Sequence, residues 1–185
     1  MPCQNEKMRK ILISGFEPFA KWTLNPSQDI ALKLAKDSKV EAIILPVSFA
    51  RCFEVLKEKI ENFRLSIVLC LGLAEKREKV SLERIAINCM NTSIADNDGD
   101  CPSNKLIQTK GPDGLFTNLD LEELLGISPN CVISNSAGTY VCNYLMYQLL
   151  FHFKDRIQAG FIHVPAENIE KSYLDIKKII DFYQN

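Results

Sequence analysis

The chain has 185 residues, of which 46% are hydrophobic and 24% charged, with a formal net charge of −1. This length suits one domain with its own core, and the balanced charge argues against a nucleic-acid partner because phosphate binding needs clustered Lys and Arg. No run of 18 apolar residues occurs, so we expect no membrane span.

Short apolar runs alternate along the chain with segments of helical periodicity. Runs rich in Ile, Leu and Val predict buried strands, whereas apolar residues spaced three and four apart predict helices. Strands are expected at 10–14, 41–47, 65–71, 80–88, 131–134 and 157–164. Helices are expected from the N-cap Asn25 past Ala35, and at 49–63, 140–153 and 166–183. The polar stretch 91–104 and the turn cluster 111–114 predict loops.

This alternation predicts an α/β fold. Strands that are apolar along their whole length must be covered on both faces, so we expect a central sheet between two layers of helices. No repeat, low-complexity segment or linker divides the chain, and residues 1–185 are therefore expected to form a single domain. Residues 1–8 are expected to be a flexible N-terminal extension.

The cysteines and the N-terminus bear on the cellular compartment. The first ten residues are polar and lack the apolar core and cleavage site of a signal peptide, which predicts a cytoplasmic protein. Seven cysteines form no CxxC pair, and several lie inside apolar runs, as Cys70 does. We therefore expect buried reduced thiols and no disulfide framework. With only two histidines and no metal-ligand spacing, no metal site is expected.

The first candidate for chemistry is Cys142. It stands at the start of the predicted helix 140–153, where the positive end of the helix dipole lowers a thiol pKa and raises the thiolate fraction. Backbone N–H groups of the same turn could stabilise an oxyanion. The alternative is that Cys142 packs as one more small, buried apolar residue.

A second candidate is His163, near the carboxyl end of the strand 157–164. Ligands gather at the carboxyl ends of strands in open α/β sheets. An imidazole there can take the proton of a thiol and later give it to a leaving amine. The alternative is a core histidine that is hydrogen-bonded to the backbone.

The third candidate is Glu83, because strand alternation over 80–88 puts it on the apolar face of Ile85 and Ile87. A carboxylate on such a face needs a partner, such as a histidine or Arg84. A buried salt bridge is therefore one explanation. The other is a catalytic acid that orients an imidazole, which in turn activates a nucleophile.

Four segments together resemble the pyroglutamyl peptidase type I family, the pyrrolidone-carboxylate peptidases, which are cysteine peptidases that remove N-terminal pyroglutamate. They run from near the start of the chain to near its end, and the segment around Cys142 is the most specific. The segments are GFEPF (15–19) with NPS (25–27), SLERIAIN (81–88), SNSAGTYVCN (134–143) and GFIHVP (160–165).

The resemblance implies a three-layer α/β/α sandwich around a twisted mixed sheet. It also implies a cytoplasmic homo-oligomer, a dimer or tetramer, without metal or organic cofactor, that acts on small peptides with an N-terminal pyroglutamate. Catalytic candidates are Glu83, Cys142 and His163, and substrate-binding candidates are Phe16, Phe19, Ile94 and Val141. Without the resemblance, core packing would be the favoured explanation of the two phenylalanines.

Three departures from the family pattern stand out. The chain has Ala20-Lys21 and Glu75-Lys76 where the family usually has glycines. Ser93 replaces an arginine that the resemblance places near the active site. We therefore expect slower turnover of pyroglutamyl amides than in members that carry the arginine. The alternatives are a cysteine amidase for another small acyl group, or a homologue that binds a ligand without turnover.

Overall fold

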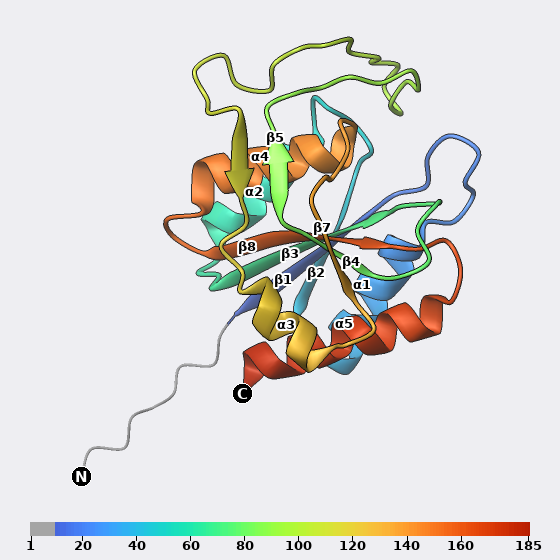
Figure 1. The fold of residues 1–185 in the computed structure, drawn as a ribbon, viewed down its shortest axis with the longest axis vertical. Coiled ribbons are helices and arrows are strands. Elements are labelled where there is room, and N and C mark those ends of the chain that lie inside the picture. The colour runs from blue at the N-terminus through green and yellow to red at the C-terminus, as the bar shows by residue number, and fades with distance from the viewer. Residues whose placement is uncertain (1–9) are drawn as a thin grey trace.

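The structure is a computed structural model that describes residues 10–185 (Figure 1). Its strands are β1 (Ile11–Phe16), β2 (Glu41–Leu45), β3 (Ile67–Leu73), β4 (Ser81–Glu83), β5 (Ile85–Ile87), β6 (Gly114–Phe116), β7 (Val132–Ser134) and β8 (Gln158–Val164). Six of them form one sheet in the order β2-β1-β3-β8-β4-β7, and β5 pairs with β6 separately. The six-stranded sheet is mixed, because β4 is antiparallel to β8 while its other neighbouring pairs are parallel.

Helices cover both faces of this sheet (Figure 1). On one face lie α2 (Cys52–Asn62) and α4 (Val141–Phe153), and on the other α1 (Pro26–Asp37), α3 (Leu121–Ile127) and α5 (Ile169–Gln184). Alternate residues of β3 enter the two layers: Val68 packs with α2 and α4, whereas Ile67 and Leu69 pack with α1 and α5. The predicted α/β/α sandwich is therefore confirmed.

The junction between β1 and α1 forms as the sequence predicts. Asn25 is the N-cap, and its side-chain oxygen accepts a hydrogen bond from the backbone N–H of Ser27 at 3.1 Å. The Ser27 hydroxyl in turn accepts one from the backbone N–H of Phe16 at 3.0 Å. These bonds fix the end of β1, and with it Phe16, against the start of the helix.

The predicted strand 80–88 is wrong as a single element. It divides at Arg84, whose N–H donates to Ser134 and whose carbonyl accepts from Thr117. The chain thereby leaves β4 in the main sheet and enters β5 in the small sheet. The alternation that placed Glu83 on a common face with Ile85 and Ile87 does not continue across this break. Glu83 is nevertheless buried, with 1% of its surface exposed.

Two elements were not predicted, α3 and β6. The helix α3 has only 7 residues, but the pair Asp120 and Glu123 at its start is a sequence signal for a helix N-terminus. In the structure the Asp120 side chain accepts a hydrogen bond from the Glu123 N–H at 3.0 Å. The strand β6 has 3 residues and pairs only with β5. Elements this short lack the periodicity from which longer ones are recognised.

Cys52, Cys70 and Cys131 are buried free thiols, as expected, whereas Cys101 is exposed. Between residues 10 and 185, no helix is both long and apolar enough to cross a membrane. Residues 1–8, expected to be a flexible extension, lie outside the described residues, and the assignment of one domain to the whole chain stays a prediction.

Candidate active site

Strand alternation places the candidate residues on the face of the sheet that α4 covers. On β8, Ile162 and Val164 pack on the α1 and α5 side, so His163 between them faces α4. On β4, Leu82 packs on the α1 and α5 side, so Glu83 also faces α4. The pairing of Ser81 with His163 brings the two strands into register beside each other.

His163 and Glu83 form a hydrogen bond in the interior. The distance from His163 Nδ1 to Glu83 Oε1 is 2.7 Å, and the two residues are 5% and 1% exposed. A carboxylate only accepts hydrogen bonds, so Nδ1 carries the proton when Glu83 is ionised. The other ring nitrogen, Nε2, is then free to accept a proton from a third group.

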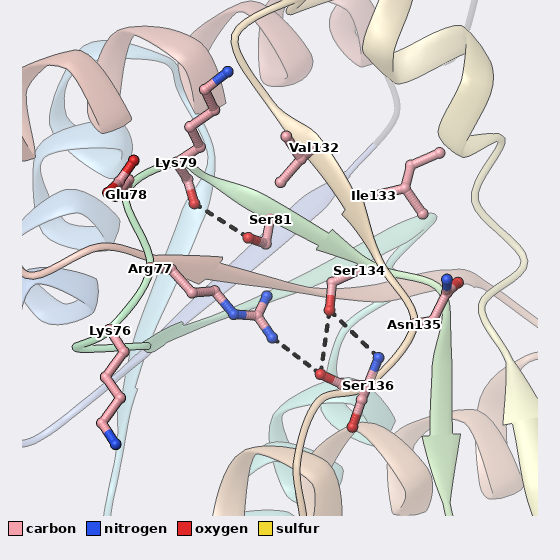
Figure 2. Close-up of a pocket in the computed structure, with 10 residues that line it drawn as sticks. All are labelled: Lys76, Arg77, Glu78, Lys79, Ser81, Val132, Ile133, Ser134, Asn135 and Ser136. Carbon is pink, nitrogen blue, oxygen red and sulfur yellow. Dashed lines mark hydrogen bonds between the residues drawn. The ribbon is translucent and has the colours of Figure 1, made fainter.

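Glu83 has a second partner, Arg77, which lies in the loop between β3 and β4. Its Nη1 is 2.5 Å from Glu83 Oε1, and its Nη2 donates to the Ser136 carbonyl at 3.0 Å. Figure 2 shows the guanidinium directed at that carbonyl. Of the two kinds of partner that the sequence suggested for Glu83, the histidine is confirmed, whereas Arg84 is wrong: it lies 3.7 Å from Glu122 on the protein surface. The break between β4 and β5 turns it away from Glu83.

Cys142 is the second residue of α4, so its predicted position at a helix start is confirmed. Its Sγ lies over Gly72 of β3, where an added Cβ would come within 2.9 Å of the sulfur and 2.7 Å of the Phe161 ring. Gly72 pairs with His163 of the neighbouring strand. The absence of a side chain at position 72 therefore lets the thiol approach the sheet next to the histidine.

The electrostatics of this thiol differ from the expectation. Burial, with the nearby Glu83 charge as the next cause, raises the pKa of Cys142 to about 12. The prediction that the pKa of Cys142 is lowered is wrong, because the loss of hydration on burial raises it. Burial also lowers the pKa of His163 below its ordinary value, although Glu83 opposes this shift. A neutral thiol beside a neutral imidazole is the resting form that these shifts favour.

A small pocket adjoins Cys142. It brings together three predicted substrate-binding residues, Phe16 at the end of β1, Phe19 in the loop after it and Val141 from α4. No charged side chain is among the residues that line it, which are Phe16, Phe19, Asn25, Val47, Leu73, Tyr140, Val141 and Cys142. The pocket therefore places uncharged, mainly apolar and aromatic walls next to a thiol, the kind of lining that suits a neutral, flat group.

The fourth predicted residue, Ile94, lies elsewhere. It is 54% exposed and lines a neighbouring groove with Ser93 and Thr139. Phe19 and Tyr140 line both the groove and the pocket, so the two are contiguous. Ile94 is thus placed to contact the part of a ligand that extends beyond the pocket.

Sequence reasoning missed several residues of the site. Tyr140 lines both the pocket and the groove, and its hydroxyl donates to the Ala95 carbonyl at 3.1 Å. Asn143 holds the start of α4 through hydrogen bonds to Ile87 and Cys89 of the β5 segment. Both flank Cys142 in the sequence, and this proximity was the available signal. Over residues 10–185, no three potential ligands are grouped to hold a metal ion.

Two departures from the family pattern contact each other at the rim of the site. Lys21, in the loop after β1, lies 2.6 Å from Glu75, in the loop after β3. Their side chains are 69% and 47% exposed, so the ion pair contributes at most about 1 kcal/mol. Ala20 beside it has φ 50°, the left-handed region that favours glycine.

Comparisons with known proteins identify the family of the chain. A family model described as pyroglutamyl peptidase matches residues 9–176. The chain belongs to the pyroglutamyl peptidase family. It is 40% identical over 166 residues to the pyrrolidone-carboxylate peptidase of Brachyspira hyodysenteriae, covering 84% of this chain and 83% of that one. The corresponding protein of Thermosipho africanus is 41% identical over 167 residues, with 84% and 81% covered. Family membership makes the chain a hydrolase of the cysteine peptidase class.

Solved structures of the family share the fold. Pyrrolidone carboxyl peptidase from Thermococcus litoralis superposes with a TM-score of 0.87 at 31% identity, covering 96% of this chain and 93% of that chain. Pyroglutamyl peptidase I from Bacillus amyloliquefaciens gives a TM-score of 0.86 at 29% identity, with the same coverage. The mixed sheet and its two helical layers are therefore those of the family.

Proposed function

We propose that this protein hydrolyses the amide bond after an N-terminal pyroglutamyl residue, with Cys142 as nucleophile, His163 as general base and acid, and Glu83 as the acid that orients His163. The observation that carries the proposal is the uncharged pocket beside the thiol. Pyroglutamate is a neutral five-membered lactam. A pocket that offers aromatic walls and no carboxylate accepts this ring and disfavours a free N-terminal ammonium group, which would be buried without a partner.

The chemistry follows from the hydrogen bonds of the site. His163 takes the proton of the Cys142 thiol as the sulfur attacks the pyroglutamyl carbonyl carbon, so the thiolate forms only as it reacts. The resulting oxyanion is stabilised by backbone N–H groups at the start of α4, which have no partner within the helix. His163 then donates the proton to the departing amine, and a thioester remains on Cys142.

Water completes the cycle. His163 takes a proton from the water as it attacks the thioester, and the thiol leaves with that proton while free pyroglutamate is released. Glu83 keeps the imidazole in the Nδ1-protonated tautomer throughout and stabilises the imidazolium that forms twice in the cycle. No group beyond the three side chains, the backbone and water is needed for this sequence.

Release of a fluorescent amine from a pyroglutamyl amide tests the proposal, with the prolyl and alanyl amides as comparisons. Prolyl amide has the same ring size but a charged nitrogen, and alanyl amide has a free ammonium group. We expect turnover of the pyroglutamyl amide alone. Preference for another acyl group would instead indicate a different cysteine amidase, and saturable binding without turnover would indicate a ligand-binding homologue.

We also propose a cytoplasmic homo-oligomer, a dimer or tetramer. Large apolar side chains at the surface support an interface, since Phe116 is 62% exposed and Leu106 is 56% exposed. Light scattering on the purified full chain measures the molar mass directly. A mass of one chain at micromolar concentration would contradict this part of the proposal.

A further inference from the structure

Arg77 connects three segments of the site. It belongs to the loop between β3 and β4, contacts Glu83 of β4 through Nη1, and donates to the Ser136 carbonyl through Nη2. Ser136 lies in the loop that leads from β7 to α4 and so to Cys142. A single guanidinium therefore joins the acid beside His163 to the segment that carries the thiol.

The orientation of Glu83 depends on very few contacts. Its side chain is fully buried, and both His163 Nδ1 and Arg77 Nη1 approach the same oxygen, Oε1. The other oxygen, Oε2, is buried and has no hydrogen-bond partner among the described residues. Removal of Arg77 would leave the buried carboxylate with His163 as its remaining partner, and a buried charge with few partners is costly and poorly fixed.

The contact with Ser136 is itself supported. The Ser134 hydroxyl donates to the same Ser136 carbonyl at 3.2 Å and accepts from the Ser136 N–H at 3.3 Å (Figure 2). Ser134 pairs with Glu83 across β4 and β7. The loop is thus held to the acid both by the backbone of the sheet and by the arginine. Lys76 and Lys79, in the same loop as Arg77, point away from this cluster (Figure 2).

Two charged groups act on His163. Glu83 of β4 favours the imidazolium, and Arg77 of the β3–β4 loop opposes it. The Cys142 thiol of α4 lies over Gly72, the residue that pairs with His163 on the neighbouring strand. Arg77 also favours the thiolate of Cys142, whereas Cys70 of β3 disfavours it. The positive charge of Arg77 therefore lowers the pKa of both the Cys142 thiol and the His163 imidazole.

We propose that Arg77 is a positioning residue of this active site, which holds Glu83 against His163 and ties both to the loop that carries Cys142. The inference rests on the proposed function. It assigns to Arg77 no contact with the substrate: the side chain reaches the reaction only through Glu83 and Ser136.

Three variants test it, Arg77→Gln, Arg77→Lys and the control Arg84→Gln, with kcat and KM for the pyroglutamyl amide measured across pH. We expect Arg77→Gln to lower kcat about 10- to 100-fold with KM within about twofold. Both limbs of its pH profile move to higher pH by about 0.5–1, because the lost cation no longer opposes protonation. Arg77→Lys keeps the charge but cannot span both acceptors, so its limbs stay in place and kcat recovers only partly. Arg84→Gln matches the wild type.

A second readout does not require turnover. The rate at which iodoacetamide alkylates Cys142 is followed by mass spectrometry of the peptide that contains it, with Cys142→Ser as the blank. In Arg77→Gln the alkylation profile should move to higher pH, even if the protein turns over no pyroglutamyl amide. The inference about Arg77 and the proposed function can therefore fail separately.

Three results would overturn the inference. Unchanged pH limbs in both the kinetic and the alkylation profiles of Arg77→Gln would leave Arg77 a structural ion-pair residue. A raised KM with unchanged kcat would make it a substrate contact. If Arg77→Gln does not fold, as judged by circular dichroism, Arg77→Lys decides: full wild-type kcat there would show that bridging Glu83 and Ser136 is not required.

Discussion

The two faces of the central sheet differ in what they bury. On the face covered by α1, α3 and α5, the buried strand residues are apolar without exception among the described residues, as Ile13, Leu71 and Ile162 illustrate. On the face covered by α4, the strands contribute Ser14, Glu83 and His163 to the interior. One face of the sheet thus buries only apolar strand residues, whereas the other also buries ionisable side chains.

This difference shows how the fold tolerates a buried ion pair. Desolvation of Glu83 and His163 is costly, and the contacts of Glu83 with His163 and with Arg77 offset only part of that cost. The opposite face adds apolar burial that requires no partner. Changes on the α4 face should therefore alter activity most, and changes on the opposite face should alter stability most.

The largest expected effect is that of Cys142→Ser on turnover. A hydroxyl is far less acidic and less nucleophilic than a thiol, so kcat/KM for the pyroglutamyl amide should fall by at least about 10³-fold. The fold should persist, with an unchanged midpoint of urea unfolding. Cys101→Ser, at an exposed cysteine, is the matched control. Substantial activity in Cys142→Ser would remove the nucleophile from the mechanism.

Glu83→Gln should reduce kcat/KM by about 10²–10⁴-fold, and His163→Ala should remove nearly all activity. The amide keeps the size of the side chain but cannot stabilise an imidazolium. The measurement is the pH dependence of kcat/KM in each variant that retains activity. If Glu83→Gln has the pH profile of the wild type, Glu83 is a structural partner of Arg77 and not the acid of a triad.

On the opposite face, Ile179→Ala should destabilise the protein by about 2–5 kcal/mol, because Ile179 of α5 is 0% exposed and its loss leaves a cavity. Folded protein should keep kcat/KM within about twofold. Leu174→Ala on the same helix is the control, since Leu174 is 49% exposed. A fall in kcat/KM in folded Ile179→Ala that matches its loss of stability would contradict the assignment of activity to the α4 face.

The pH dependence of activity follows from the two shifted groups. The pKa of His163 lies below its ordinary 6.5, so the base is neutral at neutral pH, and activity should fall only as pH drops below 6.5. The same shift makes protonation favour the unfolded chain below that pH, so stability is also lost there. The raised pKa of Cys142 places the alkaline limb above its ordinary 9.0. Tryptophan fluorescence at each pH separates unfolding from titration. An acid limb above pH 6.5 would contradict this account.

The smallest expected effect is a gain in Ser93→Arg. Ser93 lines the groove next to the pocket and is exposed, so an arginine can be accommodated there. The added cation and donors should raise kcat/KM about tenfold, or ~1.4 kcal/mol of transition-state stabilisation. Ser103→Arg, in the same exposed segment, is the control. An unchanged or lower kcat/KM in folded Ser93→Arg would show that the missing arginine does not limit this enzyme.

Most of the fold was predictable because its long elements carry strong patterns. The apolar run around Leu69 and the cap at Asn25 each depend on neighbouring residues alone, and both occur in the structure. The same holds for Cys142 at the start of α4. The elements that were missed, α3 and β6, have 7 and 3 residues, too few for a period to emerge.

The amino-acid sequence by itself determined the alternation of strands and helices, the helix start at Cys142 and the need of Glu83 for a partner. The sequence offered a histidine or Arg84 for this role, and only the tertiary structure decided that His163 and Arg77 are the partners and that Arg84 is not. The break after β4 sends Arg84 to the surface, while the β3–β4 loop brings Arg77 to Glu83. It also decided that burial is the largest influence on the pKa of the Cys142 thiol, which it raises. Both outcomes depend on which segments lie side by side and on the water they exclude, and neither can be computed from a residue's neighbours along the chain.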